Sequence, residues 1–454
     1  MNANSTVAVV VEGGGEQVVA HVGLHALGSL ADRLALGASL SARVPQPRFR
    51  FHDRGKVLVQ AMLMLAGGGE ACSDIERLRS QPSLFGVVCS DSTLYRTLRS
   101  VDASALESVW EAMAETRARV WRRSSATTGN APVILDLDAS LVDIHSENKE
   151  GTAANYKRGF GFSPMLCFAD ATGEALAGLL RPGNATANSI ADQLAVLDAA
   201  IAQLPARFAA GHHRGDDPRR VRRAVQVRAD SAGCSARLAG EFRARNIGFA
   251  VVARTNPQVK AAISRAAEDE DRWFPALTQA GEERDGAAVA ELTDLIDLTG
   301  WPAGTRFIVR REPLHPGAQT SLFPSLDYRF WGQFTDGTAS AVEADVHLRA
   351  HAHVEDHIRR LKASGLERFP FTDLDANRAW MALVCFAADL VRWFQLLCVR
   401  GPLANAEPKT LRWQLWHTPA RVVRHARQTV VRILDDWPNA DALLAAYRRI
   451  PRVA

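Results

Sequence analysis

Three acidic residues that lie far apart in the sequence could together bind divalent metal ions. Asp138 and Asp230 each end a short apolar run, VILDLD and AVQVRAD, of the kind that forms a buried strand. Glu355 lies in HVEDHIRRLKASGLERFPF, which has helical spacing, and Lys362 follows about two turns later on the same face. Carboxylates held at strand ends and on a helix suit Mg²⁺, which prefers hard oxygen ligands. A site with two such ions can cut and join phosphodiester bonds, so we predict chemistry on nucleic acid.

The residues alone leave the first aspartate open. Asp136 and Asp138 are two positions apart in one strand, so their side chains share a face. An aspartate at a strand end is more often a turn or cap residue, and a Glu–Lys pair is more often part of a solvated helix face. Only the combination of three carboxylates in a suitable order of elements favours a metal site.

The central segment has such an order of elements. The pattern predicts strands at 133–144, 161–170 and 174–183, a helix at 187–204, a strand at 224–230, a helix at 232–246 and a strand at 248–254. By analogy, a three-stranded meander followed by α/β units is the order of the ribonuclease-H-like fold. We therefore expect an α/β protein, with a ribonuclease-H-like catalytic domain that contains a β-rich insertion and is flanked by helical N- and C-terminal regions.

Five regions are expected along the chain. They are a helical DNA-end-binding region (1–125), the first part of the catalytic core (126–255), a β-rich insertion (256–345), the glutamate helix of the core (346–370, helical at about 348–365) and a helical C-terminal region (371–454). Within the insertion, strands are expected at 305–312 and 326–335. The basic stretch 207–223 has the composition of an exposed loop.

The two terminal regions offer candidate DNA contacts. Helical periodicity is found at 20–36, 53–66, 71–80 and 103–122. Between the last two, SDSTLYRTLRSVD predicts a short capped helix that carries Tyr95 and Arg96, and with the preceding helix it resembles a helix-turn-helix. Near the C-terminus, the spacing of Arg421, Arg424 and Arg427 predicts a basic helix face, which could follow DNA phosphates or be a solvated face above a core.

Composition excludes several other classes of protein. A net charge of +4 over 454 residues, with 47% hydrophobic residues, is typical of a globular protein. Six scattered cysteines without a C-x-x-C pair argue against a disulfide framework and a structural zinc site, and they favour reduced thiols. The N-terminus lacks the pattern of a signal peptide. The apolar stretch 381–399 contains Asp389 and Arg392, which favours a buried helix over a membrane span.

A histidine-rich stretch offers an alternative metal site. His347, His351, His353 and His357 lie close together, and His353 and His357 have the i, i+4 spacing of zinc ligands. The segment lacks the H-E-x-x-H order and any nearby cysteine, so a zinc site is the weaker hypothesis.

The segments around the three carboxylates carry a family resemblance. DLDASLVDIHSENKEGTAANYKRGFGFSPML, RADSAGCSARLAGEFRARNIGFAVVAR and HVEDHIRRLKASGLERFPF resemble bacterial insertion-sequence transposases of the DDE type. ANRAWMALVCFAADLVRWFQ and TLRWQLWHTPARVVRHARQTVVRI extend the resemblance to nearly the whole chain. It points to the insertion-sequence-four superfamily and is closest to the thirteen-eighty family. There a small and a hydroxyl residue follow the first aspartate, as Ala139 and Ser140 follow Asp138, so the resemblance favours Asp138 over Asp136.

The resemblance implies cut-and-paste transposition. Water would nick the transposon end, the freed 3′ hydroxyl would form a hairpin on the opposite strand, and the reopened end would join target DNA. Two Mg²⁺ ions, for which Mn²⁺ can substitute, would be held by Asp138 as the bridging ligand and by Asp230 and Glu355. The implied partners are double-stranded DNA, as terminal inverted repeats and as target, and a second copy of the chain in the end-synapsed complex. No membrane is implied, and the expected location is cytoplasmic, at the bacterial nucleoid.

The chain departs from the superfamily near the glutamate. The signature there is tyrosine, arginine, glutamate and lysine, but Leu348 and His351 occupy the first two positions, and Arg349 lies off register. Either His351 and Arg349 substitute, or the protein is an impaired or repurposed transposase that only binds DNA. A plain nuclease of the same fold is a further alternative. The residues expected to contact DNA are Lys362, Arg359, His351, Arg349, Tyr95, Arg96 and Trp331.

Two tryptophans in the insertion could take part in base stacking. Relatives stack a flipped base on an aromatic side chain, and Trp301 and Trp331 are the candidates here. Packing within the insertion is the alternative role for both.

Overall fold

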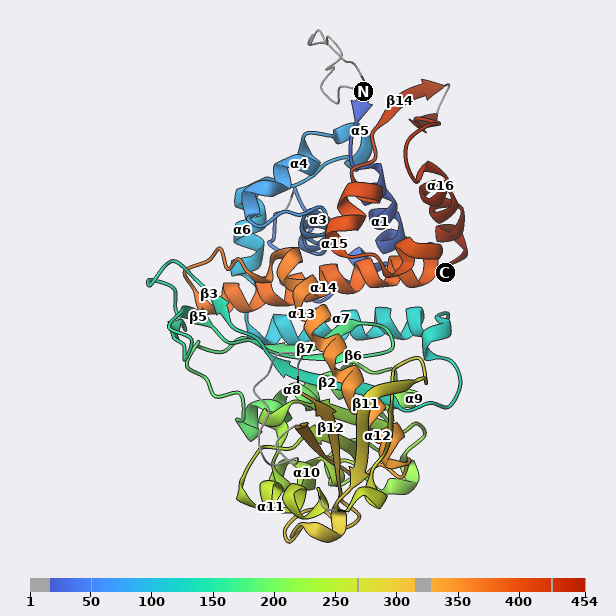
Figure 1. Ribbon diagram of the computed structural model, residues 1–454. Helices are drawn as coiled ribbons and strands as arrows, with labels where there is room; N and C mark the ends of the chain where they lie inside the picture. The colour runs from blue at the N-terminus through green and yellow to red at the C-terminus, as the bar shows by residue number, and fades with distance from the viewer. Residues whose placement is uncertain (1–16, 50, 268, 315–327, 426–427, 454) are drawn as a thin grey trace, which may run out of the picture.

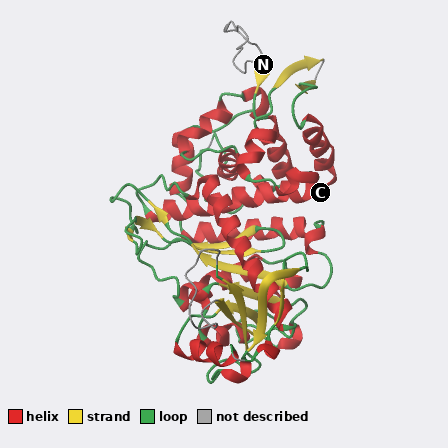
Figure 2. Ribbon diagram, in the orientation of Figure 1, coloured by secondary structure: helices red, strands yellow, loops and turns green. Residues whose placement is uncertain are grey.

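A mixed β-sheet forms the centre of the protein. The structure is a computed structural model that describes residues 17–49, 51–267, 269–314, 328–425 and 428–453. Within these residues, nine strands form one sheet in the order β10-β11-β12-β13-β9-β8-β2-β6-β7 (Figures 1 and 2). The strands are β2 (Val133–Ala139), β6 (Met165–Ala169), β7 (Glu174–Leu179), β8 (Val225–Ala229), β9 (Ile247–Val252), β10 (Phe274–Leu277), β11 (Glu283–Glu291), β12 (Arg306–Pro313) and β13 (Tyr328–Thr335).

The half of the sheet from β7 to β9 follows the predicted order. β2, β6 and β7 form an antiparallel meander, and β8 and β9 run parallel to β2. Helices α8 (Ile190–Gln203) and α10 (Ala236–Arg243) connect the later strands, as expected. The predicted helix at 232–246 begins later, because Asp230 caps a short 3₁₀ turn and Ser235 then caps α10. Since β2 and β8 are parallel, their carboxyl ends meet at one edge of the sheet.

The insertion continues the same sheet. β13 pairs antiparallel with β9, with Phe334 opposite Val251, and β12, β11 and β10 follow as successive antiparallel neighbours. The strands expected at 305–312 and 326–335 correspond to β12 and β13, although residues 326 and 327 lie outside the described residues. The sequence did not predict β10, β11 or helix α11 (Pro257–Ala266). The segment of β11, ERDGAAVAE, has low intrinsic strand preference, so its strand depends on its neighbours.

The glutamate segment is longer than predicted and is interrupted. Helix α12 (Ala341–Arg349) begins at a capping box of Ser340 and Glu343. A 3₁₀ turn (Ala350–Ala352) joins it to α13 (His353–Leu361), and a π-helical turn (Lys362–Leu366) ends the segment. The single helix expected at 348–365 is therefore wrong in its start and in its continuity. Within this last turn lies Gly365, whose φ of 112° is in the region that favours glycine.

The N- and C-terminal regions pack together as one helical body (Figure 1). Its helices are α1 (Val22–Arg33), α2 (Leu36–Ser41), α3 (Arg54–Ala66), α4 (Glu76–Arg79), α5 (Pro82–Phe85), α6 (Asp91–Arg99), α7 (Ala103–Trp121), α14 (Leu374–Cys398), α15 (Pro408–Leu411) and α16 (Ala440–Arg449). α14 contacts α3 on one side and β7 on the other. The helices predicted at 53–66 and 103–122 are confirmed, and the one at 20–36 corresponds to α1, which ends at Arg33. The expected helix-turn-helix contains an additional short helix, α5, between α4 and α6.

The predicted basic helix near the C-terminus is wrong. Residues 420–433 form a hairpin of β14 (Ala420–His425) and β15 (Gln428–Ile433), and β14 also pairs with β1 (Val18–Val19). The paired valines of VVRH and TVVR favour strands over a helix because they are branched at Cβ. Arg421 and Arg424 are both exposed but, three positions apart in a strand, they point to opposite faces, and Arg427 lies outside the described residues.

A buried ion cluster joins the helical body to the sheet. Arg117 of α7 donates to Glu174 of β7 (2.8 Å) and to Asp389 of α14 (2.6 Å), and all three side chains are fully buried. Trp121 and Trp393 also donate to Glu174. By length and composition α14 could cross a membrane, yet 78% of its most apolar window is buried inside the protein, in agreement with the predicted buried helix.

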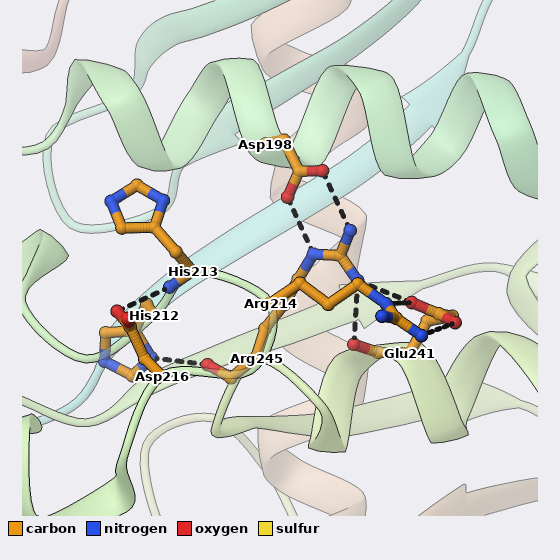
Figure 3. A network of polar contacts seen from close by, with 7 residues as sticks. All are labelled: Asp198, His212, His213, Arg214, Asp216, Glu241 and Arg245. Atoms are coloured by element: carbon orange, nitrogen blue, oxygen red, sulfur yellow. Dashed lines mark hydrogen bonds and ion pairs between the residues drawn. The ribbon is translucent and has the colours of Figure 1, made fainter.

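The basic stretch at 207–223 is largely an exposed loop, as expected, and it is fixed at several points. The ring nitrogens of His212, which is fully buried, lie 3.1 and 2.8 Å from the carbonyl oxygens of Arg245 and Arg223. Arg245 also binds Asp198 and Glu241 (Figure 3). This network holds the segment that leads into β8, which carries Asp230 at its other end.

Candidate active site

Three carboxylates line one cleft at the edge of the sheet. Asp138 lies at the end of β2, and Asp230 follows the end of the parallel neighbour β8. Glu355 reaches the same cleft from α13. The cleft has a volume of about 440 Å³ and is also lined by residues of the insertion. The structure therefore brings together the three residues that the sequence selected.

The negative charges in this cleft repel one another. Burial, together with the negative charges of Asp230 and Glu355, raises the pKa of Asp138 to about 6. The backbone N–H of Ala139 and the nearby His351 act in the opposite direction and stabilise the carboxylate. A buried carboxylate that faces two others is stabilised by a bound cation, because a cation removes the repulsion between like charges.

The three carboxylates could supply only part of the ligands that a divalent ion needs. Among the described residues, no group of three or more His, Cys, Asp or Glu side chains is close enough to hold a metal ion by itself. Asp138, Asp230 and Glu355 nevertheless supply the oxygen ligands that Mg²⁺ prefers, and Mg²⁺ usually keeps several waters and takes substrate phosphates as ligands. The donor set thus fits an ion that is shared with a phosphate-containing substrate. The same finding gives no support to the alternative zinc site of histidines.

Asp136 and Asp138 have different surroundings, which separates the two candidates. Asp136 is fully buried and forms a bidentate ion pair with Arg228 of β8 (2.8 and 2.7 Å). His351 Nδ1 lies 2.7 Å from Asp136 Oδ1. Burial by itself would raise the pKa of Asp136, but the hydrogen bonds from His351 and Arg228 hold it below its ordinary value. Asp136 is therefore part of a structural ion cluster, while Asp138 is the aspartate that lines the cleft.

The positions that depart from the transposase signature also line the cleft. Leu348 presents an apolar side chain to it, and His351 is turned toward Asp136. Arg349 donates to Asp345 (2.8 Å) and to the carbonyl oxygen of Leu277. His351 and Arg349 thus already have partners within the protein.

The insertion supplies the opposite wall of the cleft. Trp331 of β13 is 39% exposed, and the guanidinium of Arg310 lies 4.8 Å from the centre of its ring. Arg310 is the cross-strand partner of Trp331 and also pairs with Asp345 of α12 (3.1 Å). The sequence did not single out Arg310 or Asp345. The available signal for Arg310 was its position inside the apolar strand TRFIVRRE. Its partners could not be identified, because they depend on how the strands pair.

The other predicted DNA-contacting residues lie at the margin of the cleft or away from it. Lys362 Nζ donates to the carbonyl oxygen of Leu141 (3.1 Å). Arg359 is exposed and pairs with Asp356 (2.7 Å) and Glu407 (3.3 Å). These two side chains are not among those that line the cleft.

Tyr95 and Arg96 lie on helix α6, where both are exposed. The ring of Tyr95 stacks on Phe371, with ring centres 5.0 Å apart, and the guanidinium of Arg99 lies 5.8 Å from the centre of the Tyr95 ring. The two residues form a surface that is separate from the cleft lining.

The two tryptophans of the insertion have different environments. Trp301 stacks against Phe334, with ring centres 4.3 Å apart, and belongs to the packing of the insertion. Trp331 is the one that lines the cleft.

The histidines of the glutamate segment do not converge on one point. His353 Nδ1 lies 2.9 Å from Asp170 at the surface, whereas neither ring nitrogen of His357 has a hydrogen-bond partner. The zinc hypothesis therefore gains no support from their placement.

A family model described as a transposase DDE domain, group 1, matches residues 1–454. No curated protein matches the sequence. Among solved structures, the chain is similar to a piggyBac transposase in a cryo-EM synaptic complex with hairpin DNA, at 9% identity and a TM-score of 0.42. That similarity covers 87% of this chain and 78% of the other.

Proposed function

Because this chain belongs to the DDE transposase family, we propose that it catalyses cut-and-paste transposition with Asp138, Asp230 and Glu355 as its catalytic carboxylates. The observation that carries the proposal is the position of Asp138 and Asp230 at the carboxyl ends of adjacent parallel strands, with Glu355 in the same cleft. The order β7-β6-β2-β8-β9, a meander followed by two parallel strands, supports a ribonuclease-H-like core.

The carboxylates would hold two divalent metal ions. The charges of both Asp230 and Glu355 raise the pKa of Asp138, so the three carboxylates act on one another, and we propose that together they would hold the ions. We propose Mg²⁺, with Mn²⁺ able to substitute. Bound ions of this kind supply activation of the attacking hydroxyl and neutralisation of charge on the leaving oxygen. The protein's own part is to hold the three carboxylates on rigid elements and to orient the DNA phosphate between them.

The substrate would be double-stranded DNA. Trp331 offers an exposed aromatic face beside the carboxylates, which suits the stacking of an unpaired base. Arg349 and Lys362 are placed at or near the cleft, and contact with DNA would require them to exchange their present partners. Tyr95 and Arg96 on α6 would contact the transposon end farther from the chemistry.

The proposed reaction includes cleavage at the terminal inverted repeat, a hairpin at the transposon end and strand transfer into target DNA. Arg359 and His351 were expected to contact DNA as well, but Arg359 is exposed beside two acids and His351 faces Asp136. We propose a homodimer for the complex that brings two ends together. The proposed location is the bacterial cytoplasm, at the nucleoid.

A second candidate is a transposase-derived DNA-binding protein without catalysis. It is favoured by Leu348, which places an apolar side chain in the cleft where relatives carry a tyrosine. It is opposed by the retention of all three carboxylates in one cleft. A plain nuclease of the same fold would cut the ends and never join them to a target.

The test is cleavage of a labelled duplex that carries the inverted repeat flanking the gene. We expect nicking at the repeat boundary with Mg²⁺ or Mn²⁺, none with EDTA, and none with Glu355→Gln. The variant should bind the duplex as tightly as the wild type in EDTA. Specific binding without cleavage in either metal would contradict the enzyme assignment, and cleavage without target joining would select the nuclease.

A further inference from the structure

His351 and Glu355 are one helical turn apart, and they face two aspartates that are two positions apart on β2. His351 Nδ1 lies 2.7 Å from Asp136 Oδ1, while Glu355 lines the cleft together with Asp138. Four residues of a helix rise about 6 Å. Two residues of a strand rise about 6.6 Å. Because the two spacings agree, the contact between His351 and Asp136 places Glu355 opposite Asp138.

The same register continues to the end of the helix. Lys362 Nζ donates to the carbonyl oxygen of Leu141 at 3.1 Å. Lys362 is seven residues beyond Glu355, about 10.5 Å along a helix. Leu141 is three residues beyond Asp138, about 10 Å along an extended chain. The helix is therefore fastened to β2 and its following turn on both sides of the Glu355–Asp138 pair.

The contact between His351 and Asp136 is made at the junction between α12 and α13. His351 is the middle residue of the 3₁₀ turn (Ala350–Ala352) between α12 and α13. A 3₁₀ stretch inside a helix often marks a hinge. On one side of this joint, Asp345 ties α12 to Arg310 of the insertion (3.1 Å). On the other side, α13 carries Glu355, so the contact made at the joint sets the direction of the helix that bears the carboxylate.

Asp136 is a suitable anchor for this contact. Its carboxylate is fully buried and is held in place by the two hydrogen bonds from Arg228. Arg228 also donates to the carbonyl oxygen of His347 (3.0 Å), one turn before His351. Because an ionised carboxylate only accepts hydrogen bonds, the Nδ1 of His351 is the donor, and such charge-assisted bonds are the stronger ones.

We infer that His351 is a positioning residue, which sets the placement of Glu355 relative to Asp138 by fastening α13 to Asp136. This inference rests on the proposed function, because the two carboxylates matter as the proposed metal ligands. It replaces the DNA contact that the sequence suggested for His351. It also explains how the chain retains an ordered cleft without the arginine found at this position in the superfamily signature.

The test compares variants of His351 with a matched variant of its neighbour. His351→Leu removes the hydrogen bond, and His351→Asn keeps an N–H donor near the position of Nδ1. The control is His353→Leu, because His353 makes the same kind of contact, with Asp170 at 2.9 Å, but on the exposed side of the helix. Mn²⁺ affinity is measured on the DNA-free protein from the electron paramagnetic resonance signal of free Mn²⁺. Binding of the repeat duplex in EDTA and thermal unfolding are measured in parallel.

We expect His351→Leu to weaken Mn²⁺ binding on the order of 10- to 100-fold, as is typical when a residue that orients metal ligands is lost. His351→Asn should restore most of the affinity, and His353→Leu should leave it unchanged. The cleavage rate should follow the same order and recover in part at high Mn²⁺, while duplex binding in EDTA stays constant. If His351→Leu does not fold, His351→Gln takes its place, since its amide lies near the position of Nε2 rather than Nδ1.

Two results would overturn the inference. One is an Mn²⁺ affinity of His351→Leu within about two-fold of the wild type, under assay conditions in which Asp138→Asn no longer binds Mn²⁺. The other is an equal loss in His351→Leu and His351→Asn, because the hydrogen bond would then not be the cause. Both results leave the proposed function in place. The proposed function fails instead if Asp138→Asn binds Mn²⁺ and cleaves DNA like the wild type.

Discussion

Replacement of Asp138 by asparagine is expected to stabilise the metal-free protein while it abolishes strand cleavage. Burial and the charges of Asp230 and Glu355 raise the pKa of Asp138 from 3.8 to about 6. At neutral pH the folded protein therefore holds a carboxylate whose ionised form is disfavoured by its surroundings. This pKa difference corresponds to about 3 kcal/mol of stability that is lost once the group is ionised in both states. Asparagine has nearly the same shape and no charge, so it avoids this cost.

The expected effect of Asp138→Asn depends on pH. Since the pKa of Asp138 is higher in the folded state, its contribution to stability is fully present below pH 3.8 and is lost as pH rises through about 6. The variant should therefore gain about 3 kcal/mol over the wild type at pH 8 and roughly half of that at pH 5. Below pH 3.8 the two proteins should be equally stable.

Thermal unfolding in EDTA measures this difference. Unfolding entropy is about 2.1 cal/mol/K per residue, so about 1 kcal/mol shifts the midpoint of this 454-residue chain by about 1 °C. The midpoint of Asp138→Asn should rise by about 3 °C at pH 8, and Mg²⁺ should stabilise the wild type alone. The control, Asp136→Asn, should be less stable than the wild type, because it weakens the ion pair of the buried Arg228. A midpoint of Asp138→Asn below that of the wild type at pH 8 would refute the reasoning.

Three further substitutions test other parts of the structure. Arg117→Ala should lower the free energy of unfolding by about 3–5 kcal/mol in urea denaturation, because it leaves Glu174 and Asp389 buried without their cation, and a loss under 1 kcal/mol would contradict this account. Gly365→Ala should cost about 1–3 kcal/mol in the same assay, since its φ is 112° and a Cβ would lie 2.9 Å from a leucine side chain; an unchanged midpoint would show that the turn can relax. Trp331→Ala should weaken binding of the cleaved transposon end by about 1–3 kcal/mol without a change in thermal midpoint, and equal affinity would exclude stacking on this side chain.

The strands of the core could be predicted because their sequence pattern is local. VILDLD and AVQVRAD are short apolar runs, as buried parallel strands usually are, and each is followed by a turn residue. The placement of Asp138 and Asp230 at one edge of the sheet follows directly from parallel pairing. Helices with a clear apolar period, such as α3 and α7, were predicted for the same reason.

The choice between Asp136 and Asp138 could not be made from their own strand. Both point to the same face, and what separates them is Arg228, which lies opposite Asp136 in the neighbouring strand. Arg310 and Trp331 were likewise brought together by a strand register that the sequence does not reveal. These partners come from distant parts of the chain, and periodicity within one segment carries no information about them.

The hairpin at 420–433 shows the limit of periodicity. Arginines three positions apart suggested a helix, although the Cβ-branched side chains of Val422 and Val423 prefer strands. The pairing of β14 with Val18 and Val19, at the other end of the chain, decides for the strand. Intrinsic preference is weak, so tertiary pairing can override it.

The continuity of the sheet from the insertion into the core makes the two walls of the cleft mechanically unequal. Trp331 is connected to Asp138 through the paired strands β13, β9, β8 and β2, and a hydrogen-bonded ladder of this kind resists opening. The facing wall is the jointed pair α12 and α13, which is held by side-chain contacts. When a DNA duplex enters, we therefore expect the insertion to stay rigid. The movement needed to admit and release the strand would then occur in the helix that carries Glu355.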